Sequence, residues 1–104
     1  MELLTKDILD KLPPLGSTEK LRNDAIVQVK FFTPDGGWTW WGIEFDAKDG
    51  LFYGLVQGFE LEFGYFSLDE LKEVKGVWNL SVERDLYFKP ISLGELLRQL
   101  GRES

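Results

Sequence analysis

Apolar and polar residues alternate along the middle of the chain with the period of two that is typical of β-strands. Residues 25–33, 38–46, 51–57 and 59–66 each show this alternation or a short apolar run, and Pro, Asp and Gly residues separate them. The run 51–57 is apolar on both sides, which predicts an interior strand. Four antiparallel strands joined by short turns are therefore predicted, and residues 80–88 are a less regular candidate for a fifth.

Three short helices are predicted by capping residues and by apolar positions three and four residues apart. One is expected over residues 6–12, capped by a threonine and ended by two prolines. The pattern Ser-x-x-Glu occurs twice and predicts helices over 68–74 and 93–100. We therefore predict one domain, residues 1–104, with an α+β fold in which two or three short helices cover one face of an antiparallel sheet of four to five strands.

The other face of the sheet is expected to carry polar and aromatic side chains. In the second strand, alternation separates two sets of side chains: Trp41, Ile43 and Phe45 on one side, and Trp38, Trp40, Glu44 and Asp46 on the other. Both sets contain tryptophan, and a shift of one residue exchanges them, so the pattern leaves open which set is core. From the neighbouring strands the open face is expected to include Gln28, Lys30, Phe32, Glu60 and Glu62.

The composition narrows the chemistry that this chain can perform. It contains no cysteine and no histidine, which excludes disulfides, thiolate metal sites and thiol nucleophiles, and also histidine general bases and histidine-bound metals. Carboxylate, lysine or tyrosine chemistry remains. We assign no catalytic residue, no metal ligand and no cofactor, and we favour a protein that is not an enzyme.

The charge argues against nucleic acid and for a protein partner. The chain has 18 acidic and 12 basic residues, a net charge of −6 and a pI of about 4.6, whereas binding to a phosphate backbone requires a basic surface. An acidic surface suits a basic protein partner. No signal sequence and no long apolar run is present, so we expect no membrane association and a cytoplasmic location. The sequence leaves the oligomeric state open.

Three pairs of carboxylates are candidates for chemistry because each pair is spaced two residues apart. On a strand, such side chains point the same way, about 7 Å apart at their Cα atoms. Two pairs together could hold Mg²⁺, Mn²⁺ or Ca²⁺, or act as acid and base on a sugar. A solvated sheet face is the simpler explanation. The pairs are Glu44 with Asp46, Glu60 with Glu62, and Glu83 with Asp85.

Tryptophan on an open sheet face is a second candidate feature. Such side chains stack on bases or sugars or anchor protein interfaces, although packing in the core is the alternative. Phe32 is expected to lie beside these tryptophans. The candidate binding residues are therefore Trp38, Trp40, Glu44, Asp46, Glu60 and Glu62.

Six blocks of sequence, in order along the chain, resemble a small bacterial family. They are L-L-T-K-D-I-L-D-K-L-P-P-L at 3–15, V-K-F-F-T-P at 29–34, W-T-W at 38–40, E-F-D at 44–46, G-Y-F-S-L at 64–68 and E-R-D-L-Y-F at 83–88. The family they resemble is a domain of unknown function that is often encoded on plasmids and other mobile elements. The resemblance implies no reaction, ligand or catalytic residue. Its genetic setting implies a role against host defences, such as antirestriction.

Three functional hypotheses follow. The first is a non-enzymatic protein-interaction module of the bacterial cytoplasm that acts on a host or DNA-binding protein through the face bearing Trp40, Glu44, Glu60 and Glu62. The second is a carboxylate-based or metal-dependent hydrolase that uses the sheet-face residues Glu44, Asp46, Glu60 or Glu62. The third is single-stranded nucleic-acid binding by Trp38, Trp40 and Lys30.

Overall fold

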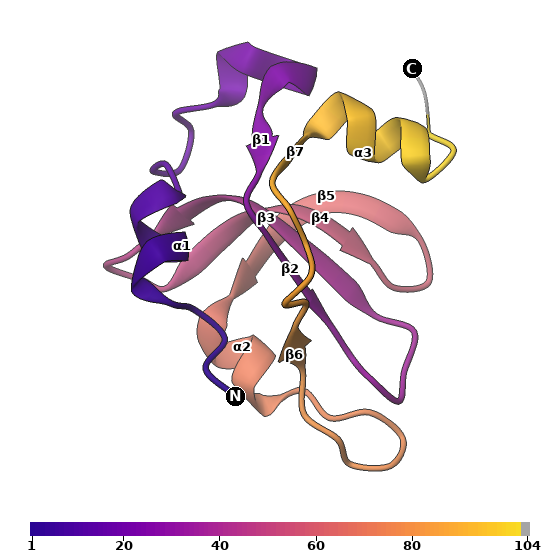
Figure 1. Ribbon diagram of the computed structural model, residues 1–104. Helices are drawn as coiled ribbons and strands as arrows, with labels where there is room; N and C mark the ends of the chain where they lie inside the picture. Colours follow the sequence, from indigo (N-terminus) through magenta and orange to yellow (C-terminus); the bar gives the residue numbers. More distant parts are fainter. Residues whose placement is uncertain (103–104) are drawn as a thin grey trace.

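The centre of the protein is a five-stranded antiparallel sheet, seen in a computed structural model that describes residues 1–102 (Figure 1). Its strands follow the order β5-β4-β3-β2-β6. They are β2 (Val29–Phe32), β3 (Thr39–Asp46), β4 (Leu51–Gln57), β5 (Leu61–Ser67) and β6 (Glu83–Arg84). A second, two-stranded sheet pairs β1 (Ile26–Val27) with β7 (Ile91–Ser92). The predicted α+β fold and number of sheet strands are confirmed.

The helices are short. The three α-helices begin where the sequence predicts, whereas the 3₁₀ helix was not predicted. They are α1 (Lys6–Lys11), α2 (Leu68–Glu73), α3 (Leu93–Gln99) and the 3₁₀ helix η1 (Glu19–Asp24). The hydroxyls of Thr5, Ser67 and Ser92 each accept a hydrogen bond from the backbone N–H three residues later, which caps the three α-helices. Within the described residues, none of the helices has the length and apolar character needed to cross a bilayer.

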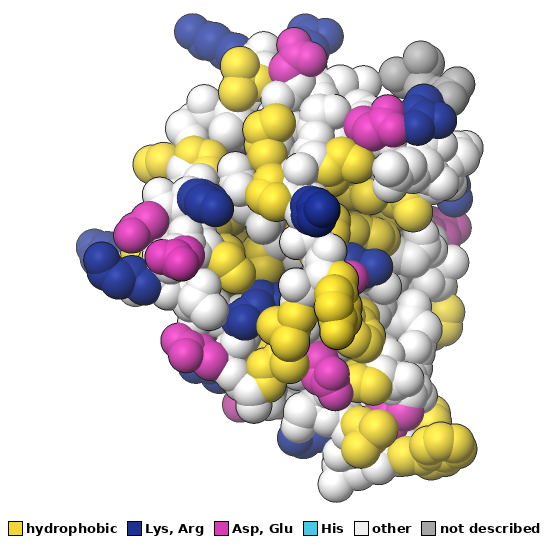
Figure 2. All heavy atoms as spheres, viewed as in Figure 1, with side chains coloured by type: hydrophobic (Ala, Val, Ile, Leu, Met, Phe, Trp, Pro, Cys, Tyr) yellow, Lys and Arg dark blue, Asp and Glu magenta, His cyan; other side chains and the backbone are white. Residues whose placement is uncertain are grey.

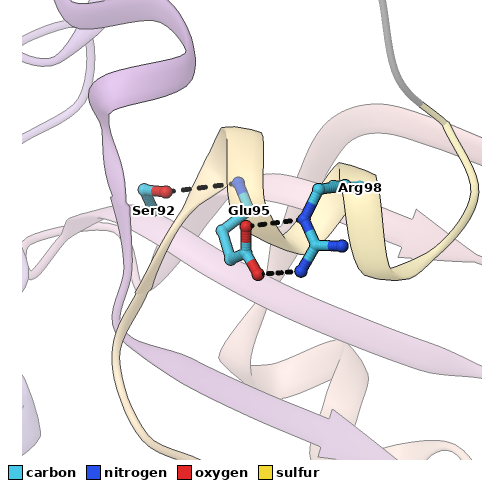
Figure 3. A network of polar contacts seen from close by, with 3 residues as sticks. All are labelled: Ser92, Glu95 and Arg98. Atoms are coloured by element: carbon cyan, nitrogen blue, oxygen red, sulfur yellow. Dashed lines mark hydrogen bonds and ion pairs between the residues drawn. The ribbon is translucent and has the colours of Figure 1, made fainter.

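Helix α3 shows how cap and side chains act together (Figure 3). The Ser92 hydroxyl accepts a hydrogen bond of 3.2 Å from the Glu95 N–H, and the Arg98 guanidinium holds the Glu95 carboxylate through two contacts, one of them 2.8 Å from Nε. The hydrogen bond from Arg98 lowers the pKa of Glu95. Because this pair is exposed, it contributes little to stability. The docking of α3 depends instead on its buried leucines, Leu93 and Leu96.

The sheet has a hydrophobic cluster on each of its two faces. On the α2 face, Phe31, Phe52 and Phe66 pack with leucines from α2 and the N-terminal segment. On the α3 face, Trp41 and Leu55 pack with the leucines of α3. The expectation that the helices cover only one face is wrong, because neighbouring strand positions are apolar on both sides of the sheet and both sides require cover.

A β-bulge in β3 moves side chains from one face to the other. Gly42 pairs with Gly54 of β4, whereas Glu44 pairs with the adjacent Tyr53, so Ile43 is an extra residue on β3. As a result, Ile43 packs on the α3 face and Phe45 on the α2 face. The prediction that Trp41, Ile43 and Phe45 share one face is therefore wrong, because simple alternation fails at the bulge.

Candidate functional site

Trp38 and Phe59 form the centre of an exposed aromatic group at one end of the sheet. The β2–β3 turn and the β4–β5 turn lie at this same end because successive strands are antiparallel (Figure 1). The ring of Phe59 meets that of Trp38 edge on, with centroids 5.8 Å apart. A side chain at Gly58 would lie 2.4 Å from the indole, so only glycine permits Trp38 to lie against the β4–β5 turn.

A third segment, the loop of residues 75–81, reaches the same end and is fixed there by Asp35. The Asp35 Oδ2 atom accepts hydrogen bonds from the backbone N–H groups of Trp78 (2.6 Å) and Leu80 (3.3 Å). The loop closes on itself through the Gly76 N–H, which donates to the Leu80 carbonyl at 3.0 Å. A Cβ on Gly76 would lie 1.6 Å from Asp35 Oδ1, so the loop approaches Asp35 as closely as it does only with glycine there.

These three segments present four exposed apolar side chains that we name the aromatic end. Trp38 is 39% exposed, Val77 82%, Trp78 80% and Phe59 96%. Figure 2 shows hydrophobic side chains gathered at lower right, over the 75–81 loop and the β2–β3 turn. Exposed apolar side chains at one end of a sheet, on turns whose backbone is held by hydrogen bonds, are typical of an interaction surface.

Two of the predicted acidic residues, Glu60 and Glu62, lie beside this aromatic end. Together with Trp38 and Phe59 they line a shallow hollow of about 230 Å³, and both carboxylates are exposed. The structure thus brings Trp38, Glu60 and Glu62 together, as the sequence predicts. Their role in binding stays a prediction.

Trp40 is buried and does not take part in an open face. It is 6% exposed and belongs to the hydrophobic cluster on the α2 face. Its ring lies under that of Trp38, with centroids 6.0 Å apart and planes at 25°. The expectation that Trp40 is part of an exposed binding face is wrong, because Trp40 pairs across the strands with Phe31, whose side is core. Trp40 instead supports the exposed indole of Trp38.

Glu44 and Asp46 lie away from the aromatic end. The Glu44 carboxylate is 3% exposed and accepts hydrogen bonds from Gly16 N (2.8 Å), Thr18 N (2.9 Å) and Thr18 Oγ1 (2.5 Å). Asp46 Oδ1 accepts a hydrogen bond of 3.0 Å from the Lys48 N–H in the β3–β4 turn. The expectation that these two residues share an open face with Glu60 and Glu62 is wrong, since the bulge turns Glu44 to the α3 face.

Glu44 lines a cleft on the α3 face that we name the tyrosine cleft. Glu44, Tyr53 and Tyr65 are direct neighbours across β3, β4 and β5. The opposite wall is η1, and the volume of the cleft is about 370 Å³. Burial raises the pKa of the Tyr53 phenol, and Tyr65, Glu44 and Glu19 raise it further, so this phenol stays a neutral hydrogen-bond donor well into the alkaline range.

The remaining candidates lie apart from one another. Lys30 pairs with Asp85 at 3.5 Å, close to β6. It is on the opposite side of β2 from Phe31, so it does not share a surface with Trp40. Within residues 1–102 no three acidic side chains converge in the manner of a metal site. The three acidic pairs therefore do not combine into one constellation.

Four residues of this surface were not predicted, namely Asp35, Phe59, Val77 and Trp78. Trp78 and Val77 fall outside every predicted helix and strand, and this position in the sequence could have indicated that they are exposed. A tryptophan between Gly76 and Asn79, in a segment without periodicity, has no strand or helix face through which to reach the core. Such a residue is expected to be exposed.

The comparisons with known proteins give a family and nothing more specific. Residues 3–97 match the family described as "Protein of unknown function (DUF2958)". A search of the curated proteins gave no match. A search of the solved structures gave no match either.

Proposed function

We propose that this chain, which belongs to the DUF2958 family of proteins of unknown function, is a non-enzymatic module that binds another protein through its aromatic end. The supporting observation is that four apolar side chains from three separate turns are exposed at one end of the sheet. Burying Phe59 and Trp78 in an interface would gain roughly 2 kcal/mol for each side chain, and large aromatic residues are the usual anchors of such interfaces.

The partner that suits this surface presents an apolar side chain next to lysine or arginine. Glu60 and Glu62 border the hollow beside Trp38, and the chain as a whole carries a charge of −6. Complementary charge at the border of an interface speeds association and selects among partners. A protein with a basic surface, such as one that binds DNA in the bacterial cytoplasm, has this chemistry.

Site-specific photo-crosslinking tests the proposal. Benzoylphenylalanine is placed at Phe59 and, in a matched control, at Tyr87, which is 92% exposed and lies beyond β6 rather than at the aromatic end. We expect a protein adduct in the producing cells from position 59 but not from position 87. The same adduct should be lost when Trp78→Ala is added.

Two outcomes would count against the proposal. One is that position 59 forms no adduct, or only adducts that position 87 also forms. The other is an adduct that persists undiminished in a variant combining Trp38→Ala with Trp78→Ala, since these side chains would then not contribute to binding.

A further inference from the structure

The tyrosine cleft lies on the α3 face, whereas Glu62 and the hollow beside Trp38 lie on the opposite side of the sheet. The tyrosine cleft opens to solvent, and its volume of about 370 Å³ falls within the range of small-ligand sites. From its geometry we propose that the tyrosine cleft binds an alkylammonium group, supplied by a free small cation or by a lysine side chain of another protein.

Three aromatic rings form the sheet side of the cleft. The rings of Tyr53 and Phe63 are stacked with centroids 6.3 Å apart and planes at 11°. The ring of Tyr65 is tilted by 57° against that of Tyr53, at 5.1 Å. Tyr65 is 65% exposed and Phe63 50%, so their surfaces are accessible to a ligand. The faces of aromatic rings attract cations, and grouped rings are the usual receptor for alkylated ammonium ions.

A buried carboxylate without a cation lies at the inner end of the cleft. The three hydrogen bonds that Glu44 accepts come from two backbone amides and one hydroxyl, all of them neutral donors. None of the ion pairs found in the described part of the chain includes Glu44. Buried charges in proteins are usually paired with an opposite charge, and here the charge faces a cavity.

The electrostatic field in the cleft has the sign that a cation requires. Burial, Tyr65, Glu44 and Glu19 all raise the pKa of the Tyr53 phenol, and the two carboxylates do so because a nearby negative charge opposes its ionisation. Arg22 is the one basic side chain that lines the described cavity, and it is exposed at the rim in a backbone conformation with φ of 50°. Its charge opposes a bound cation, and this opposition makes Arg22 a useful test position.

Choline and its neutral isostere 3,3-dimethylbutan-1-ol provide the primary experiment. Each is titrated into the ¹⁵N-labelled full chain while amide chemical shifts are recorded. We expect saturable shifts with choline at Tyr53, Phe63 and Tyr65, and none with the neutral alcohol. An equal response to the two compounds would overturn the proposal, because binding would then owe nothing to charge.

Surface variants separate a cation site from other sites. Tyr65→Ala and Glu19→Gln should each weaken choline binding about threefold or more, since a ring face or a negative charge is lost. Arg22→Ala should strengthen it. Tyr87→Ala, at an exposed aromatic residue that does not line the cleft, should leave choline binding unchanged. Loss of binding in Arg22→Ala would identify an anion site instead and refute the inference.

A second arm distinguishes the two sources of the ammonium group. An acetylated tripeptide with a central trimethyl-lysine is titrated in the same way. Binding that is tighter than that of choline would support a side chain of another protein as the ligand, and equal or weaker binding would support a free cation. If neither compound produces saturable shifts in the cleft, the inference is wrong, and the proposed function of the aromatic end is unaffected.

Discussion

Glu44 connects the N-terminal part of the chain to the sheet. Its two carboxylate oxygens accept three hydrogen bonds from residues 16 and 18. The next segment, η1, forms one wall of the tyrosine cleft, so the position of that wall depends on this carboxylate. A single buried side chain therefore determines both local stability and the shape of the cleft.

Replacing Glu44 by glutamine should lower the free energy of unfolding by about 1–3 kcal/mol. The amide of glutamine offers one oxygen and one NH₂ group, so at least one of the three donors would face another donor instead of an acceptor. Urea unfolding followed by tryptophan fluorescence measures the change. Glu62→Gln, an exposed position on β5, is the matched control and should change the free energy by less than about 0.5 kcal/mol. Equal losses in the two variants would contradict the role given to Glu44.

At the residue scale, sequence predicts side-chain direction only up to the first irregularity. Trp38, Glu60 and Glu62 gather as expected because the alternation in β5 is regular and the turns at this end are short. Glu44 does not join them, because the extra residue Ile43 reverses every side chain that follows. Gly42 directly precedes the extra residue, and glycine within a strand often marks a bulge, but it does not show which side chains change face.

At the scale of elements, stability is divided between two faces of one sheet. Leu71 of α2 is 1% exposed in one cluster, and Leu96 of α3 is 5% exposed in the other. Neither helix exceeds seven residues, and helices of this length are not stable alone. Each helix therefore depends on the sheet for its structure, and the sheet depends on both helices for cover.

Leu71→Ala and Leu96→Ala should each destabilise the protein by about 2–5 kcal/mol, because each leaves a cavity in a packed cluster. Chemical denaturation gives both values. Leu86→Ala, at a leucine that is 63% exposed, is the control and should cost less than about 1 kcal/mol. A loss in Leu96→Ala as small as that of the control would show that α3 is not part of the core.

Elements with local signals were predictable, and those that depend on distant pairing were not. The three α-helices begin at a threonine or serine whose hydroxyl satisfies a nearby N–H, which is visible in four consecutive residues. The small sheet exists only because β1 pairs with β7. Its paired residues Val27 and Ile91 are 64 residues apart in the sequence. The pattern predicts one strand over residues 25–33, and it shows neither the break between β1 and β2, nor the two-residue strand β7, nor the shortness of β6.

For the whole molecule, the fold separates side chains that stabilise it from side chains that remain available for contact. The two clusters bury the interior aromatics, whereas Phe59, Val77 and Trp78 are almost fully exposed at one end of the sheet. Since their backbone is held by turns and by Asp35, these side chains are presented in a fixed arrangement. A preordered surface reduces the entropy that association costs.

The double variant Phe59→Ser with Trp78→Ser should therefore retain the stability of the parent protein to within about 1 kcal/mol, because little apolar area is lost from the folded interior. Urea midpoints and slopes of the variant and the parent provide the measurement, with Leu71→Ala as the destabilised reference. Benzoylphenylalanine placed at Trp38 should crosslink the partner in the otherwise unchanged protein, and this adduct should be lost in the double variant. A loss of stability as large as that of Leu71→Ala would place the two aromatic side chains in the core. If these side chains serve binding rather than folding, the urea midpoint should be unchanged and the adduct should be lost.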